Sequence, residues 1–344
     1  MQNNSIFSKH DFRLWLVGEL FILIFIALVF GIGSARGWWE PLDTGNSDRF
    51  LPEPRVFGNK GEKFRDNGFW SQAYWYYWQS KPEDQTWWGS HLFPWAGYIL
   101  HQSLVWVFMY KAQMENLKFP KYGNKLNKWN WQLFITNCVF YLLHLGQTHW
   151  TYDGTAIDVI ITSGLSSVSM MIAFVFILEF HDRGLIFGWP QKNHDDGLSQ
   201  ILRKMTEKTS YIIRKYHGYC FVWFNIWTFW YHPLENTYAH ATGIFLIWQF
   251  LLQSSLIYTD MHRVRPWRFF VEISVVIHGP AVAIQMELFD ENPAGPPSLW
   301  PMFLYGFLFC FILTSIFTLD TFRKLKWYLR PLPWTIFMIW VFLY

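Results

Sequence analysis

The chain is poor in charged residues, which make up only 15% of its 344 positions. A soluble domain of this size usually carries about a quarter charged residues. Hydrophobic residues reach 52% and aromatic residues 22%. Apolar runs as long as a membrane span are present, so the chain is predicted to be an all-α, polytopic membrane bundle formed by a single domain, residues 1–344.

Cysteine is also scarce, and Cys138, Cys220 and Cys310 are scattered through apolar segments. The absence of CxxC and CxxCH leaves zinc ribbons, thioredoxin-type redox motifs and covalent haem attachment without support. The chain also lacks HExxH, GxSxG and P-loop motifs, which removes the usual signatures of zincins, serine hydrolases and nucleotide hydrolases. No repeat of 20–50 residues is present.

Eight apolar segments are each close to the roughly 20 residues that a helix needs to cross a bilayer. They lie at residues 14–33, 92–112, 129–149, 157–180, 217–234, 237–258, 269–289 and 298–319. Residues 34–91 are predicted to form an extracytoplasmic loop, whose Trp- and Tyr-rich end is typical of a membrane interface. The tail at 332–344 is expected to be a half-helix or an interfacial foot.

Lysine and arginine are distributed unequally between the loops. They are concentrated in loops 113–128, 181–216, 259–268 and 323–330, whereas loops 150–156, 235–236 and 290–297 contain none. Positive residues gather on the cytoplasmic side, so an integral multi-pass protein with both termini in the cytoplasm is predicted. The basic amphipathic loop 181–216 is expected to lie along anionic lipid rather than to bind nucleic acid.

Histidines and carboxylates are the ionisable groups of greatest interest, because such groups at membrane depth are rarely kept without a use. At about 1.5 Å per helical residue, His101 and His278 lie near the membrane midplane. Six further candidates lie towards the outer surface: His144, His149, His232, His240, Glu235 and Glu287.

Polar residues recur at helical spacing inside the spans. Asn137, Tyr141 and His144 stand at i, i+4 and i+7, which places them on one helix face. Similar stripes run through the segments 157–180, 237–258 and 269–289. Such stripes must face protein or water rather than lipid, so they predict a polar interior that opens outward.

Three functions are compatible with this pattern. Imidazole with a few carboxylates suits Fe, Cu or Zn. The first hypothesis is therefore a membrane-embedded metal-dependent enzyme, an oxidoreductase or hydrolase acting on a lipid-soluble or small substrate. Its metal ligands would be His144, His149, His232 and His240. Its catalytic groups would be the carboxylates of Glu235 and Glu287.

The second hypothesis is a b-type haem protein that transfers electrons, with His101 and His278 as the axial pair. The third is a non-catalytic subunit of a membrane complex or a transporter, in which each histidine only forms hydrogen bonds. In all three the bilayer is a partner, and a lipidic substrate or other membrane subunits are the further partners expected.

Overall fold

The computed structural model describes residues 9–35, 88–118, 122–155, 175–176, 178–179, 182–190, 197–231, 238–288 and 300–343. Every regular element in these ranges is a helix, which confirms the all-α class. The longer helices are α1 (His10–Ala35), α3 (Trp88–Lys118), α4 (Lys128–Thr155), α6 (Gly197–Tyr231), α7 (Tyr238–Ser255), α8 (Arg265–Leu288), α9 (Trp300–Leu313) and α11 (Leu332–Leu343). The turns between them contain η4 (Met261–Arg263), η5 (Ser315–Thr318), α10 (Asp320–Arg323) and η6 (Trp327–Leu329).

Most of the predicted spans coincide with helices. The segments correspond to α1, α3, α4, the second part of α6, α7, α8 and α9. The segment 157–180 lies mostly outside the described residues, as does the predicted loop 34–91. Within the described ranges, two helical stretches are long and apolar enough to cross a membrane by length and composition alone, His10–Val29 and Trp300–Thr318.

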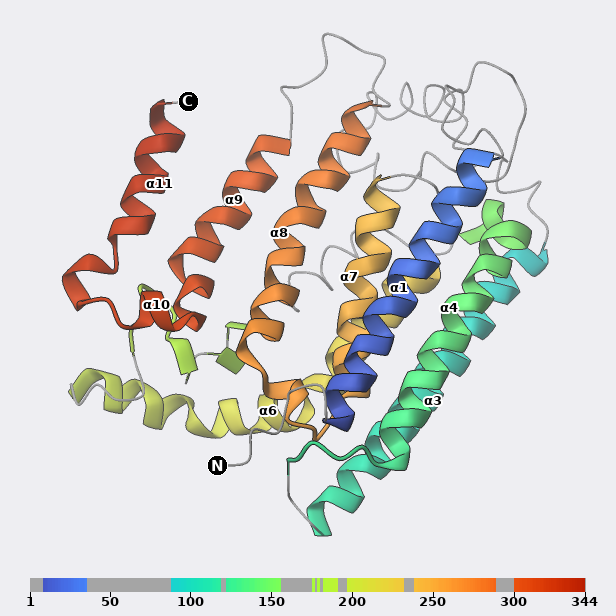
Figure 1. Ribbon diagram of the computed structural model, residues 1–344, viewed down its shortest axis with the longest axis horizontal. Helices are drawn as coiled ribbons and strands as arrows, with labels where there is room; N and C mark the ends of the chain where they lie inside the picture. Colours follow the sequence, from blue (N-terminus) through green and yellow to red (C-terminus); the bar gives the residue numbers. More distant parts are fainter. Residues whose placement is uncertain are drawn as a thin grey trace.

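Figure 1 shows the long helices other than α6 side by side. The first part of α6 lies across their lower ends. The sequence predicted a surface loop at 181–216 followed by a separate span. Instead, residues 197–231 form one helix of 35 residues, while the short segment 182–190 before it turns back on itself. Because no proline interrupts residues 197–231, the backbone hydrogen bonds of α6 continue through the junction.

The two ends of the described chain lie at opposite ends of the bundle (Figure 1). α1 begins at the lower end, whereas α11 turns upwards beside α9 and ends at the upper end. This arrangement differs from the predicted placement of both termini on one side. The tail was expected to be a half-helix or an interfacial foot, and Leu332–Leu343 form a helix of twelve residues that reverses the direction of α9.

The start of α4 is set by an asparagine pair. Asn127 precedes the helix, and its Oδ1 accepts hydrogen bonds from the N–H groups of Trp129 and Asn130 at 2.8 and 3.0 Å. In return, Asn130 Oδ1 accepts the N–H of Asn127 at 2.9 Å, as in a capping box. Asn130 Nδ2 also donates to the carbonyls of Ser255 and Ile257, which fixes this cap against the end of α7.

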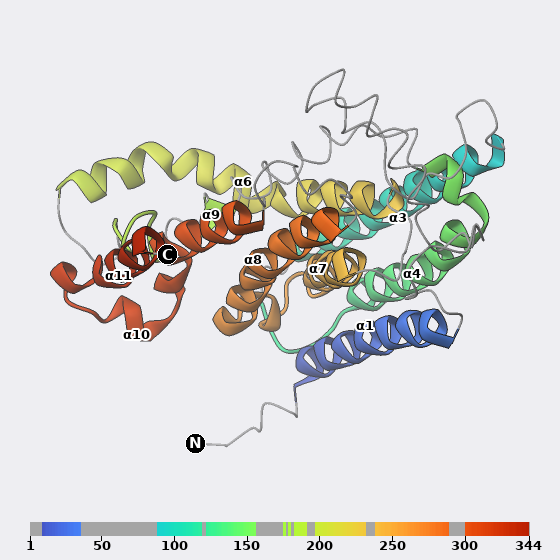
Figure 2. The same cartoon turned by 90° about the horizontal axis from the view of Figure 1, so that it is seen from above.

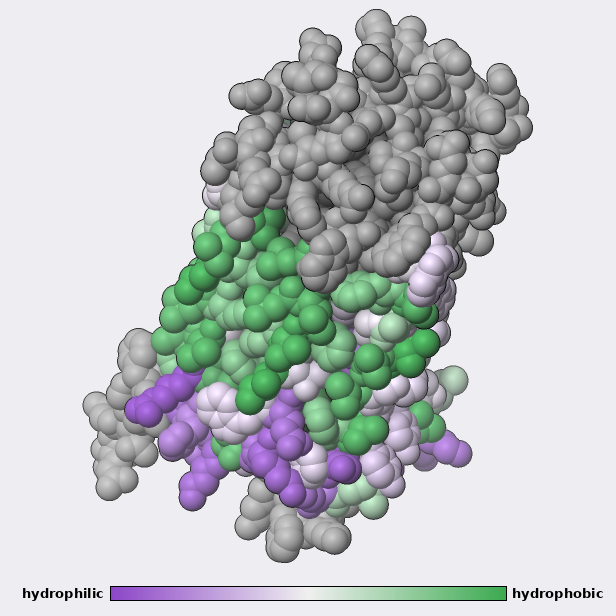
Figure 3. Space-filling model, turned by 90° about the vertical axis from the view of Figure 1, so that its right-hand side faces the viewer, coloured by the Kyte–Doolittle hydropathy of each residue, from purple (hydrophilic) through white to green (hydrophobic). Residues whose placement is uncertain are grey.

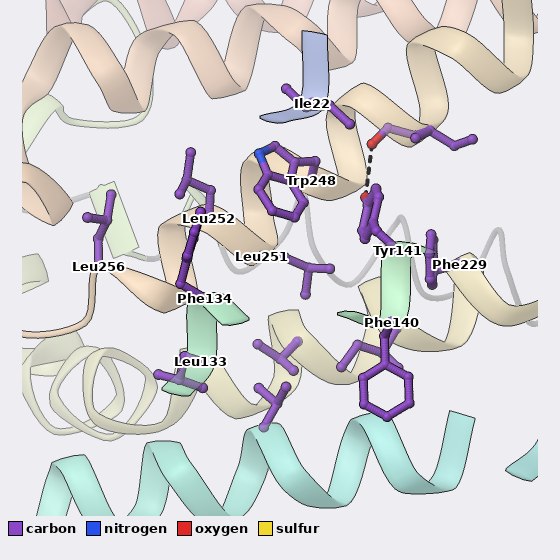
Figure 4. Close-up of a cluster of buried hydrophobic side chains, with 14 of the residues drawn as sticks. Ile22, Leu133, Phe134, Phe140, Tyr141, Phe229, Trp248, Leu251, Leu252 and Leu256 are labelled. Carbon is purple, nitrogen blue, oxygen red and sulfur yellow. Dashed lines mark hydrogen bonds between the residues drawn. The ribbon is translucent and has the colours of Figure 1, made fainter. Parts of the chain in front are cut away.

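Two apolar clusters lie in the described part of the interior. The larger one joins α1, α3, α4, α6, α7 and the start of α8 and includes Leu133, Tyr141, Phe229 and Trp248 (Figure 4). The smaller one joins α8, α9 and η5 through Val276, Phe311, Ile316 and Phe317. The predicted midplane histidines belong to different packing groups, because α3 packs mainly on α4 and α6 while α8 packs mainly on α7 and α9.

Candidate functional site

His101 lies at the centre of a buried group of rings and amides between α3, α4 and α6. Its side chain is fully buried, and its ring stacks on Phe140 with centroids 4.3 Å apart. Trp230 Nε1 donates a hydrogen bond to His101 Nδ1 at 3.3 Å, and His101 Nε2 lies 2.9 Å from Asn137 Oδ1.

The neighbours of His101 determine its proton position. Asn137 Nδ2 faces the carbonyl of Leu251 at 3.2 Å and Ser255 Oγ at 3.1 Å, so Asn137 must present its oxygen to His101. An indole N–H can only donate. His101 is therefore a neutral imidazole that carries its proton on Nε2. Both ring nitrogens are therefore engaged in hydrogen bonds.

The predicted polar face of α4 is buried and connects helices. Tyr141 donates from its hydroxyl to the carbonyl of Ile244 on α7 at 3.0 Å. His144, one turn further along α4, is buried with its ring centroid 4.1 Å from that of Phe229 and 5.7 Å from that of Trp230. With Asn137, these residues attach α4 to α6 and α7, as polar side chains do between helices in a membrane.

His278 lies on α8, apart from the group around His101. Its Nδ1 lies 3.0 Å from the hydroxyl of Thr242 on α7. Gly243 allows this contact, because a Cβ at that position would lie 2.9 Å from His278 Cε1. The two histidines of the predicted haem pair thus have different neighbours: His101 contacts α4 and α6, whereas His278 contacts α7.

The remaining predicted site residues are described only in part. The backbones of His149, His240 and Glu287 belong to α4, α7 and α8, near the helix ends that lie together at the upper end of the bundle (Figure 1). Their side chains lie outside the description, as do His232 and Glu235 altogether. Among the described side chains, no group of three or more His, Cys, Asp or Glu is placed to hold a metal ion.

Sequence reasoning missed a buried ion pair at the lower end. Arg183 is 2% exposed, and its Nη1 donates to both carboxylate oxygens of Glu272 on α8, at 2.6 and 2.7 Å. The same nitrogen lies 3.2 Å from Thr318 Oγ1 in η5. The pair is separated by 89 residues in the sequence, so no local pattern could have revealed it.

A second charged contact extends this cluster. Arg268, one turn before Glu272 on α8, forms an ion pair with Glu179 and lies 3.9 Å from Asp182. The backbone N–H of Phe187 donates to the carbonyl of Leu313 at the end of α9. These contacts hold the segment 182–190 against α8, α9 and η5, which indicates a structural role.

Comparison with models of known protein families, with curated proteins and with solved structures found no match.

Proposed function

We propose that the chain is a multi-pass membrane protein that crosses the bilayer eight times, at the segments predicted from its sequence. The distribution of side chains on α4 supports this proposal most directly. Asn137 and His144 are each 1% exposed, whereas Ile135 and Leu142 on the opposite face are each 55% exposed. A helix with polar groups inside and large apolar groups outside is stable in lipid and unfavourable in water.

Neighbouring helices show the same distribution, with polar side chains buried and large apolar side chains exposed. On α3, His101 is buried while the adjacent Ile99 and Leu100 are exposed. Figure 3 shows the resulting apolar belt, with hydrophilic residues gathered below it. Because several inward-facing residues are polar, the average hydropathy of these helices is low although their outer surface is apolar. This explains why, within the described ranges, composition alone selects α1 and the α9 region as span candidates.

The lower end of the bundle is assigned to the cytoplasm. The turns that carry Arg263, Arg265 and Lys326 lie there, and positive residues favour the cytoplasmic side. α11 leads away from this surface. Its twelve residues reach about 18 Å, which is shorter than the roughly 30 Å of a hydrocarbon core. α11 is therefore proposed to extend from the cytoplasmic surface into the outer half of the bilayer.

Within this architecture, the third hypothesis is favoured: a non-catalytic subunit of a membrane complex or a transporter. The observation that carries it is the hydrogen-bond pattern around His101, whose two nitrogens are both used by Trp230 and Asn137. His101 thus connects α3, α4 and α6 rather than binding a cofactor. Other membrane subunits and the lipid bilayer are the partners that this role requires.

Three measurements test the proposal in turn. Washing membranes with alkaline carbonate should leave the protein in the pellet; release into the supernatant would contradict membrane integration.

For topology, Asn124→Cys and Leu343→Cys are made in a variant without native cysteines and labelled with an impermeant maleimide. Asn124→Cys is expected to be labelled from the cytoplasmic side and Leu343→Cys is not. Labelling of Leu343→Cys from the cytoplasmic side would contradict the assigned direction of α11.

The third measurement concerns function, and it uses purified protein. Metal analysis and a visible absorption spectrum should show neither stoichiometric metal nor a Soret band. A Soret band would favour the haem hypothesis, and a stoichiometric colourless metal would favour the enzyme.

A metal-dependent enzyme remains the second candidate because of one observation. His149, His240 and Glu287 are on helix ends that lie at the same end of the bundle, and His232 and Glu235 precede α7 in the sequence. Imidazoles and carboxylates of this kind could hold Fe, Cu or Zn. If they bind one ion, His149→Ala and His240→Ala should each remove it, whereas His101→Ala should leave the metal content unchanged.

A further inference from the structure

Glu19 is a carboxylate inside α1, whose stretch His10–Val29 is long and apolar enough to cross a membrane. It follows the start of α1 by nine residues, which corresponds to roughly 14 Å along the helix axis. Charged groups at this depth are expensive and commonly mark a functional site. The side chain of Glu19 therefore requires a partner that offsets the free-energy cost of its burial.

A close approach of two helices brings that partner near. A Cβ on Gly18 would lie 2.5 Å from Leu252 Cδ1, so the absence of a side chain there lets α1 contact α7. On the same level, Trp248 Nε1 donates to the carbonyl of Gly18 at 2.9 Å. The next residue along α7 is Gln249, which is 0% exposed, and its Nε2 donates to Glu19 Oε2 at 3.1 Å. α1 and α7 lie side by side in Figures 1 and 2.

The pair has more acceptors than donors. Glu19 Oε1 and Gln249 Oε1 are both buried, and neither has a hydrogen-bond partner among the described residues. An ionised carboxylate and an amide together offer three acceptor oxygens but only one donor group, whichever way the amide is turned. A proton on Glu19 would correct this imbalance, because the acid O–H could donate to the amide oxygen while the amide N–H donates to the acid.

No other described group supplies the missing positive charge. No Lys or Arg within the described ranges forms an ion pair with Glu19. On α4, Tyr141 donates to a backbone carbonyl, and Cys138 carries no positive charge. In the turn below α7, His262 bonds to the carbonyl of Gln253, and Arg263 lies over the ring of Tyr122.

We propose that Glu19 and Gln249 form a proton-binding site inside the membrane, in which Glu19 binds and releases a proton reversibly. The inference goes beyond the proposed membrane function and rests on α1 being a membrane span. Ionisation of Glu19 leaves a carboxylate held by a single neutral donor, and reprotonation restores the reciprocal acid–amide pair. A transporter or a subunit of a proton-coupled complex has a use for such a group.

The test uses dicyclohexylcarbodiimide, an apolar reagent that modifies protonated carboxyl groups within membranes. Trypsin cleavage after Arg13 and Arg36 releases the segment 14–36, in which Glu19 is the only carboxyl side chain. Mass spectrometry of this peptide from intact membranes is expected to show the adduct at pH 6–7 and progressively less of it towards pH 10. Glu19→Gln should abolish the adduct on this peptide and leave the protein folded.

Glu272 is the internal control, since it is also largely buried but is held by Arg183 and should stay unmodified. Absence of the adduct at pH 6 in membrane-integrated protein, or equal labelling from pH 6 to 10, would overturn the proposal. Protection by Na⁺ at constant pH, without protection by choline, would also overturn it and assign the oxygens to a cation. Release by alkaline carbonate would instead show that the proposed membrane function had failed.

Discussion

The carboxylate of Asp11 accepts a hydrogen bond from the backbone N–H of Met261 at 2.8 Å, across 250 residues of sequence. Its other oxygen accepts the N–H of Phe12 at 2.9 Å, and the backbone N–H of Asp11 donates to the carbonyl of Asn124. Asp11 also lies in the first turn of α1, where the helix dipole favours a negative charge. Asp11 thus joins α1 to the turn that precedes α8 through its side chain and to the turn that precedes α4 through its backbone.

Asp11→Ala is therefore expected to lower the free energy of unfolding by about 2–3 kcal/mol, because it leaves buried N–H groups without an acceptor. Asp11→Asn should cost less, since its oxygen can still accept one bond. Unfolding by SDS in mixed micelles measures both effects. The matched control is Asp260→Ala, which removes an exposed carboxylate next to Met261 and should change little. Equal effects at the two positions would contradict the role of Asp11.

Asn137 is predicted to be the main polar connection between α3, α4 and α7. Asn137→Ala removes its bonds to Leu251 and Ser255 and leaves the Nε2–H of His101 unpaired. We expect a loss of about 2 kcal/mol in the same unfolding measurement. Ile135→Ala, on the exposed face of the same helix, should cost less than about 0.5 kcal/mol. A larger loss at Ile135 than at Asn137 would contradict the assignment of an inner and an outer face.

The sequence predicted the features that depend on local periodicity. Most helix positions followed from the length of apolar runs, and the common face of Asn137, Tyr141 and His144 followed from helical spacing. The partners of those residues could not be predicted, because contacts such as Glu19 with Gln249 join positions 230 residues apart. The haem pairing of His101 and His278 relied on equal depth alone. Depth does not determine which helices are neighbours, and here α3 and α8 belong to different packing groups.

The buried pair of Arg183 and Glu272 is expected to be far more sensitive than an exposed pair. Glu272→Gln should destabilise the protein by about 3–5 kcal/mol, because it leaves the Arg183 guanidinium buried without a counter-charge. Replacing both residues with Met should cost much less than either single change. The control is the exposed pair of Arg265 and Asp320, 3.0 Å apart, for which Asp320→Asn should cost at most about 1 kcal/mol. Additive effects of the two Met replacements would show that the buried charges are not coupled.

The turn between α7 and α8 should make stability depend on pH through His262. Burial, reinforced by the positive charge of His217 and of Arg268 and Arg263, lowers the pKa of His262 to about 4, although its Nδ1 bonds to the carbonyl of Gln253. In the unfolded chain the pKa is about 6.5, so between these values the unfolded state binds more protons.

The contribution of the neutral His262 to the free energy of unfolding is therefore fully present above about pH 6.5. It is lost as the pH falls towards about 4. The loss should reach at most about 3 kcal/mol and should appear as a falling thermal unfolding temperature in a mild detergent. His262→Gln keeps a side-chain donor near Gln253 but cannot be protonated, so its unfolding temperature should fall less over the same range. His10→Gln, at an exposed position of α1, is the control and should follow the unmodified protein. A His262→Gln profile parallel to that of the unmodified protein would assign the acid sensitivity to other groups.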